Sequence, residues 1–282
     1  MSYRDGVARR AVTEALRLRG RHGGAADQPI CPIDLALAEG IDVRFESMRS
    51  LEGMYTPDVP LIVLGSLRPR GRRAYTCAHE LGHHVFGHGL RIDEILDGSP
   101  EKMGKDDAEY VADRFAAALL MPKLAVLHAF AVRRWDVGAC DPEQVFTIAG
   151  FLGVGYTTLV GYLEGTLRII TSPVAVRLRK SSPKTIRSRI VGTDGPGGVV
   201  IVDEFWSGRP VDAEVGDFLV VPSGASADEE IVERAGERLF RAKASGATRL
   251  RRGTWQADLR IMRTGYTGLA HYRHLEEAND KT

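Results

Sequence analysis

Apolar residues in the first half of the chain recur mostly at the spacing of helices. Residues 7–18 place apolar side chains about one turn apart with arginines between them, which predicts an amphipathic helix. Residues 32–39 predict a second, shorter helix, because Gly40 follows in the C′ position where glycine ends many helices.

Three short apolar runs come next. Residues 41–45 and 61–64 are bounded by turn residues and predict two strands, and residues 51–55 between them predict a third. A small sheet should therefore accompany the N-terminal helices.

Two longer helices follow this predicted sheet. Residues 74–86 form the first, which ends at a glycine-rich stretch. The second should begin at Asp106 or Asp107, since either is a good N-cap, and should run to Leu120. The chain then remains mostly helical to about residue 163.

The pattern changes near residue 170. Beyond it, apolar runs are short and often β-branched, and glycine and proline clusters separate them. These runs predict strands at residues 174–178, 199–202, 218–221 and 255–262. We therefore expect an α+β protein, with a mostly helical domain over residues 1–170 and a strand-rich domain over residues 171–282.

Composition is that of an ordinary folded protein. Of 282 residues, 44% are hydrophobic and 27% are charged, which argues against global disorder. A net charge of +1 gives no whole-chain attraction to nucleic acid or anionic lipid. Three scattered cysteines, no secretory signal pattern and no uncharged apolar run of about 20 residues lead us to expect a cytoplasmic protein without a membrane partner.

The segment His79-Glu-Leu-Gly-His83 carries the clearest chemical signal. Residues four apart lie on the same face of a helix, so His79 and His83 could bind one Zn²⁺ together. Glu80 would then lie beside the metal and could accept a proton from its water. The alternative is a helix with two surface histidines.

A third ligand is needed if zinc is to keep one position open for water. Glu109 could complete a His₂Glu site, and Asp113, one turn later, could fix the tautomer of a ligating imidazole. In the metzincin pattern the third ligand would be a histidine at position 89 with glycine at position 86, but the chain has Gly89 and Phe86. The carboxylate site is therefore the better interpretation, although a solvated acidic face would also explain the two carboxylates.

The segments 73–88 and 109–122 resemble the ImmA/IrrE family of zinc metallopeptidases. The upstream residues 32–64 resemble it as well, so the resemblance covers about residues 5–165. Two positions depart from the family pattern: Gly65 stands where the family often has asparagine, and Asp113 follows Ala112 where the family often has asparagine.

The resemblance implies a gluzincin-like site with His79, His83 and Glu109 as zinc ligands and Glu80 as general base. It also implies a typical substrate, a helix-turn-helix transcriptional repressor cut at one site to relieve repression. Some family members belong instead to toxin–antitoxin or phage-defence systems. His₂Glu sites can also accept manganese.

Peptide hydrolysis would need a further donor for the developing oxyanion. Four residues are candidates by proximity in sequence, namely Tyr55, Tyr75, His84 and His88. For the two histidines, a packing role at the helix end is the plainer explanation. An extended substrate could add to the edge of the small sheet along residues 61–64.

Weaker signals lie further along the chain. Residues 141–165 contain a helix-turn-helix-like spacing with Gly153 at the turn, but the second helix carries no lysine or arginine. Residues 174–189 hold six basic side chains and no acid, so they could meet nucleic acid or form a solvated strand face. By analogy with family members alone, residues 170–282 are expected to form a GAF-like sensor that binds a ligand or forms a homodimer.

The leading interpretation is a zinc-dependent endopeptidase with a regulatory C-terminal domain. The alternative is a non-catalytic regulator or toxin–antitoxin-type protein that binds a repressor, an antitoxin or nucleic acid. An intact Glu80 favours the enzyme, because a purely structural zinc site has no need for that base.

Overall fold

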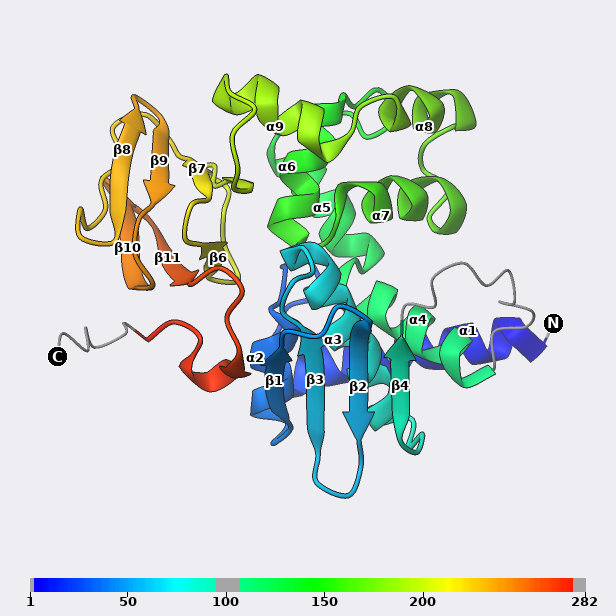
Figure 1. The fold of residues 1–282 in the computed structure, drawn as a ribbon. Helices are drawn as coiled ribbons and strands as arrows, with labels where there is room; N and C mark the ends of the chain where they lie inside the picture. Colours follow the sequence, from blue (N-terminus) through cyan, green and yellow to red (C-terminus); the bar gives the residue numbers. More distant parts are fainter. Residues whose placement is uncertain (1–2, 95–106, 276–282) are drawn as a thin grey trace, which may run out of the picture. The chain divides into compact units, whose positions relative to one another are not determined.

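The computed structural model describes residues 3–94 and 107–275, and these form two compact units (Figure 1). Of the described residues, unit 1 holds those up to His128 together with Leu152–Val154 and Thr267–His271. Unit 2 holds Ala129–Phe151, Gly155–Tyr266 and residues 272–275. This division rests on contacts within the chain and does not test where one evolutionary domain ends and the next begins. The predicted domain boundary near residue 170 therefore stays a prediction.

Unit 1 is built on a five-stranded sheet of order β12-β1-β3-β2-β4. Its strands are β1 (Asp42–Glu46), β2 (Leu51–Thr56), β3 (Leu61–Gly65), β4 (Arg91–Glu94) and β12 (Gly268–Leu269). Strands β1 and β3 run parallel, and the other neighbours are antiparallel. The three predicted strands are confirmed, whereas β4 and β12 were not predicted.

The predicted role of residues 61–64 as a sheet edge is wrong. These residues form β3, which pairs with β1 on one side and with β2 on the other. Three of the four are buried, and they include side chains of both faces of this central strand. The strand therefore has no free backbone groups with which to add a substrate chain.

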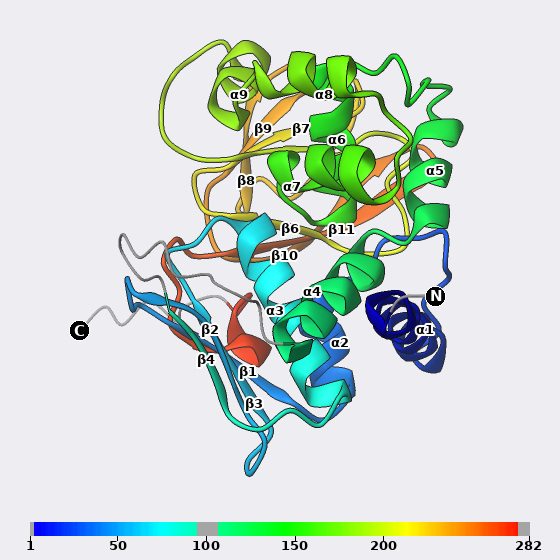
Figure 2. The same cartoon turned by 90° about the vertical axis from the view of Figure 1, so that its right-hand side faces the viewer.

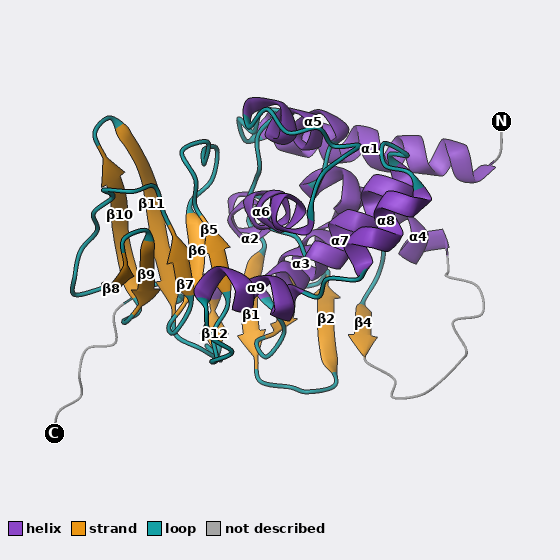
Figure 3. Ribbon diagram, turned by 90° about the horizontal axis from the view of Figure 1, so that it is seen from above, coloured by secondary structure: helices purple, strands orange, loops and turns teal. Residues whose placement is uncertain are grey.

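Helices cover one face of this sheet in two layers (Figures 2 and 3). The helices are α1 (Tyr3–Arg21), α2 (Pro32–Ala38), α3 (Arg70–Val85) and α4 (Asp107–Leu120). Helices α2 and α3 pack directly on the strands, and α4 packs on α3 and α1. All four predicted helices are confirmed, and Gly40 has the positive φ of 78° that its predicted role at the end of α2 requires.

The stretch Asp107–Val132 includes α4 and α5 (Lys123–Val132). By length and composition it could cross a membrane, because the mean hydropathy of its most apolar window is 1.8. Of its most apolar window, 61% is buried inside the structure. Buried core helices of soluble proteins are often as long and as apolar as this stretch, so it is weak evidence for a membrane span. The expected absence of a membrane partner stays a prediction.

The N-terminal part of unit 2 is helical. It contains α6 (Pro142–Leu152) except its last residue, α7 (Tyr156–Gly161), a π-helical turn (Tyr162–Thr166), α8 (Ser172–Arg179) and α9 (Pro183–Val191). The strand predicted at residues 174–178 is wrong, because these residues lie in α8. Pro173 stands in the first turn of that helix, and the buried Ala175 and Leu178 lie three residues apart, which is a helical spacing.

The remainder of unit 2 is rich in strands, as predicted. The strands are β5 (Val199–Ile201), β6 (Val211–Glu214), β7 (Phe218–Val220), β8 (Val232–Gly236), β9 (Leu239–Ala242), β10 (Gly246–Arg252) and β11 (Trp255–Met262). They form a sheet of order β10-β11-β6 and another of order β5-β7-β9-β8. The mixed α+β class is confirmed, and the GAF-like character of this region stays a prediction.

Candidate metal centre

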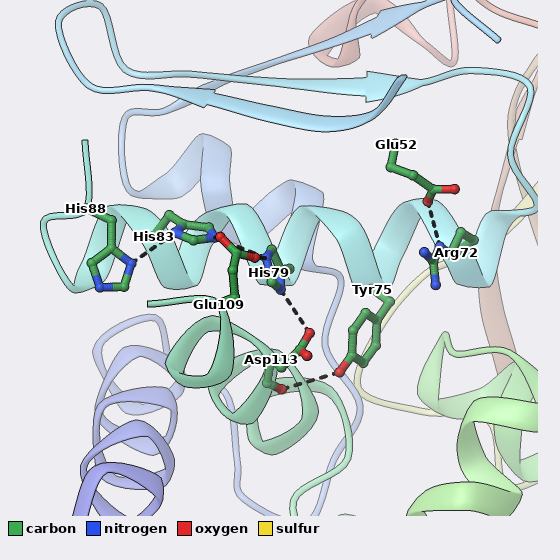
Figure 4. Close-up of polar contacts among 8 residues, drawn as sticks. All are labelled: Glu52, Arg72, Tyr75, His79, His83, His88, Glu109 and Asp113. Atoms are coloured by element: carbon green, nitrogen blue, oxygen red, sulfur yellow. Dashed lines mark hydrogen bonds and ion pairs between the residues drawn. The ribbon is translucent and has the colours of Figure 1, made fainter. Parts of the chain in front are cut away.

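One face of α3 carries three ring side chains at intervals of four residues. Tyr75, His79 and His83 all point toward α4 (Figure 4). Four residues are slightly more than one helical turn, so the three side chains form a row along the helix. His83 is completely buried, and His79 is 6% exposed.

The two imidazoles meet the carboxylate of Glu109 from α4. Nε2 of His79 lies 3.0 Å from Nε2 of His83 and 3.1 Å from Oε2 of Glu109. Nε2 of His83 lies 3.4 Å from Oε1 of Glu109. One donor atom from each of the three residues lies within 4.8 Å of the others, so they could hold one metal ion. The predicted His79, His83 and Glu109 thus come together from two helices.

A glycine lets these two helices approach closely. Gly82 of α3 faces Ala112 of α4, and a Cβ added to Gly82 would lie only 3.0 Å from the Cα of Ala112. Any larger side chain at position 82 would push α4 away and move Glu109 from the histidines. This role of Gly82 has no signal in the sequence pattern and was not predicted.

Each histidine has a second contact through its other ring nitrogen. Nδ1 of His79 lies 3.1 Å from Oδ1 of Asp113, as predicted for a residue that fixes the tautomer. Nδ1 of His83 lies 2.9 Å from Nδ1 of His88. Tyr75 donates a hydrogen bond from its hydroxyl to the backbone carbonyl of Asp113, at 3.3 Å, and so ties α3 to α4 at the same level.

The charge state of Glu109 suits a cation ligand. Hydrogen bonds from His79 and from His83 lower the pKa of this carboxyl well below its ordinary value, and they outweigh the opposing effect of burial. Glu109 is therefore a carboxylate at neutral pH, which is the form that binds metal ions.

Glu80 lies on the face of α3 that packs against the sheet, whereas His79 and His83 face Glu109 of α4. Its side chain is completely buried, and it is next to Gly53 of β2. A Cβ added to Gly53 would lie 2.5 Å from Oε1 of Glu80 and 2.4 Å from Cγ2 of Thr76. The strand therefore determines where the carboxylate of Glu80 can lie.

The four candidates for oxyanion stabilisation lie in different surroundings. Tyr55 of β2 places its hydroxyl 2.8 Å from Nδ1 of His84, and burial lowers the pKa of that histidine. Tyr75 contacts Asp113, and His88 contacts His83, as described above. The assignment of an oxyanion donor among them stays a prediction.

The helix-turn-helix-like spacing at residues 141–165 corresponds to a sharply bent helix pair. Helix α6 and the helical segment that begins with α7 are inclined by 103°, and Gly153 between them has the positive φ of 76° that such a turn requires.

The basic run 174–189 forms two helices rather than a strand face. Several of its cations are engaged within unit 2: Arg177 donates to the carbonyl of Cys140 at 3.0 Å, and Arg179 pairs with Glu164 at 2.6 Å. Arg187 is buried and donates to three backbone carbonyls of the following loop. These contacts favour a structural role for much of the run.

Comparison with known proteins identifies the region that holds the metal-binding group. Residues 36–161 match the model of a peptidase family described as the IrrE N-terminal-like domain. These residues are an IrrE N-terminal-like domain. The domain includes His79, Glu80, His83, Glu109 and Asp113, and it covers less than half of the chain.

A curated relative of this domain is the radiation response metalloprotease IrrE of Deinococcus radiodurans. It is 28% identical over 90 residues, which are 32% of this chain and 27% of the relative. The matched part of this chain therefore spans about a quarter of the full length of that relative.

A solved structure, a Mycobacterium tuberculosis transcriptional regulator, is 19% identical and has a TM-score of 0.36. The similarity covers 55% of this chain and 46% of the regulator. It supports no conclusion about fold or activity.

Proposed function

We propose that the chain is a zinc-dependent endopeptidase. The observation that carries this proposal is the convergence of two imidazole nitrogens and a carboxylate, with interatomic distances of 3.0, 3.1 and 3.4 Å. Two nitrogens and one oxygen suit zinc and leave a fourth position open for water, as in other catalytic zinc sites. Manganese is the alternative metal, because it accepts the same donors.

His79, His83 and Glu109 would hold the ion in the IrrE N-terminal-like domain. A zinc ion bound there supplies Lewis-acid activation of a water molecule and of the peptide carbonyl. Glu80, the next residue after His79, would accept the proton of the attacking water at a carboxylate oxygen and pass it to the leaving amine. Asp113 would orient His79 by accepting the hydrogen of its Nδ1.

Replacement of the base separates catalysis from metal binding. Glu80→Gln should keep about one zinc ion per chain, because the three ligands survive, and should abolish peptide cleavage. His83→Ala and Glu109→Ala should both lose the zinc. Elemental analysis of the purified proteins and mass spectrometry of cleavage products measure the two effects, and full cleavage by Glu80→Gln would refute the assigned mechanism.

The substrate that this domain favours is a helix-turn-helix transcriptional repressor. This part of the proposal rests on the resemblance to the ImmA/IrrE family, in which such a repressor is the typical target. Purified repressors of this class, incubated with the zinc-loaded protein and with Glu80→Gln as control, should be cut at one site by the former only. Intact repressors throughout such a panel would remove this substrate class but not the peptidase activity.

A further inference from the structure

His88 returns to the metal-binding histidines through the turn that ends α3. Gly87 has a positive φ of 65°, and the backbone amide of His88 donates to the carbonyl of His83 at 2.9 Å. The amide of Gly87 donates to the carbonyl of His84 at 3.1 Å. These two bonds define a Schellman motif, in which the chain folds back over the last turn of the helix. The residue five places after His83 is thus brought above it.

The side chains of these two histidines meet through their Nδ1 atoms. The two nitrogens lie 2.9 Å apart, and the ring centroids lie 5.0 Å apart (Figure 4). Nε2 of His83 faces His79 and Glu109, so a metal ion there would use the lone pair of Nε2. The hydrogen of a neutral His83 must then be on Nδ1, and Nδ1 of His88 is the acceptor that faces it.

An aromatic neighbour holds the ring of His88 in this orientation. His88 stacks on Phe86, with ring centroids 6.0 Å apart and an interplanar angle of 24°. Phe86 is in turn held by Arg10 of α1, whose guanidinium lies 5.3 Å from its ring centroid, and by an edge contact with Phe115 of α4. The acceptor on His88 is therefore fixed before any metal ion binds.

We propose that His88 is a positioning residue for the metal ligand His83. It holds the tautomer that leaves Nε2 free and fixes the plane of the ring, just as Asp113 does for His79. This inference rests on the proposed metal site, and it gives each of the two histidine ligands its own partner. Outer partners of this kind change metal affinity by about 10- to 100-fold when they are removed.

The test is the zinc affinity of His88→Phe, measured at pH 7.5 by competition with a chromophoric chelator. Phenylalanine keeps a ring that can stack on Phe86 but has no acceptor, so we expect zinc to bind about 10- to 100-fold more weakly. His88→Asn is the rescue variant, because its Oδ1 can occupy the place of Nδ1, and it should recover most of the affinity. His128→Phe is the matched control, because this histidine of α5 lies 4.0 Å from Asp27 and has no part in the proposed site, and it should bind zinc as the parent does.

Thermal unfolding of the metal-free proteins separates positioning from folding. His88→Phe and the parent should unfold at similar temperatures without metal, and zinc should raise the unfolding temperature of the parent more than that of the variant. An unchanged zinc affinity of His88→Phe would refute the role of His88 alone. A parent protein that binds no zinc would instead refute the proposed function and this inference with it.

Discussion

The position of Glu80, the proposed general base, depends on a single glycine of the facing strand. Gly53 of β2 lies against both Glu80 and Thr76, and a Cβ at this position would come within 2.5 Å of the former and 2.4 Å of the latter. Side-chain carbon atoms do not approach other atoms so closely in real structures. The β-branched Thr76 is stiff, so most of the required movement falls on Glu80.

Gly53→Ala should therefore impair catalysis without removing the metal. A displacement of the base by about 1 Å can cost on the order of 100-fold in rate, and the extra methyl should lower the free energy of unfolding by about 1–3 kcal/mol. Zinc content should stay that of the parent, because His79, His83 and Glu109 lie on the side of α3 that faces α4. Cleavage rates, elemental analysis and urea unfolding measure the three quantities.

Gly150→Ala in α6 is the matched control, since open space surrounds a Cβ at that position. It should leave cleavage and zinc content unchanged. Cleavage at the parent rate by Gly53→Ala would show that β2 does not hold the base.

Spacing in the sequence was enough to predict three residues that the structure brings together as a possible metal-binding group. His79, His83, Glu109 and Asp113 follow from four-residue intervals on two helices, because a helix turns such residues to one face. The part of His88 could not be predicted in this way. It depends on a left-handed turn at Gly87, whose effect on a side chain appears only when the chain is folded.

At the scale of elements, segments with a clear hydrophobic pattern were predicted correctly, whereas the shortest strand and one short helix were not. All four N-terminal helices and three strands of the first sheet were predicted, whereas β12, with two residues, has no pattern to recognise. The run in α8 is short, apolar and β-branched, which predicts a strand, but the proline in its first turn and its buried face belong to a helix. β-Propensity is a weak guide where a buried face favours the helix.

Strand β12 is a late part of the chain that completes an early sheet. Gly268 and Leu269 pair with Phe45 and Arg44 of β1, and Ala270 next to them is completely buried. Unit 1 thus contains residues 267–271, although residues 155–266 before them belong to unit 2. The pairing covers the edge of β1, which would otherwise expose unpaired backbone groups.

Ala270→Asp should detach this segment and weaken unit 1. An unpaired carboxylate at a buried position costs about 3–5 kcal/mol, so the segment either leaves β1 or remains at that cost. Amide hydrogens of Asp42–Glu46 should then exchange faster with solvent, and the urea midpoint should fall. His271→Asp at the exposed neighbouring position is the control, and unchanged exchange in β1 for Ala270→Asp would mean that β12 contributes nothing to this edge.

At the scale of the whole molecule, the two compact units and the family-matched domain have different boundaries. The IrrE N-terminal-like domain covers residues 36–161, and this range contains residues of both compact units. The composition of the sequence changes near residue 170, although strands become frequent only from β5 at Val199 onward, and chain contacts depend on which faces are buried. Composition reports the type of element, so it could predict the α+β class but not the units.

The stability of the molecule against acid should depend on a half-buried histidine of unit 2, His274. Burial, together with nearby Arg273 and Arg260, lowers the pKa of His274 from 6.5 to about 4, although Asp212, 3.6 Å away, opposes them in part. The unfolded chain therefore takes up a proton near pH 6.5 that the folded protein refuses until about pH 4. The contribution of the neutral His274 to the free energy of unfolding is fully present above pH 6.5 and is lost as the pH falls toward 4.

Between pH 7.5 and pH 5 this one group should lower the free energy of unfolding by about 2 kcal/mol. His274→Gln has no such proton to take up, so its loss of stability over the same range should be smaller than that of the parent by this amount. Urea unfolding of both proteins at the two pH values, in the presence of a chelator, measures the difference without any change in metal binding. Equal losses in parent and variant would mean that His274 is accessible enough to bind its proton in the folded protein.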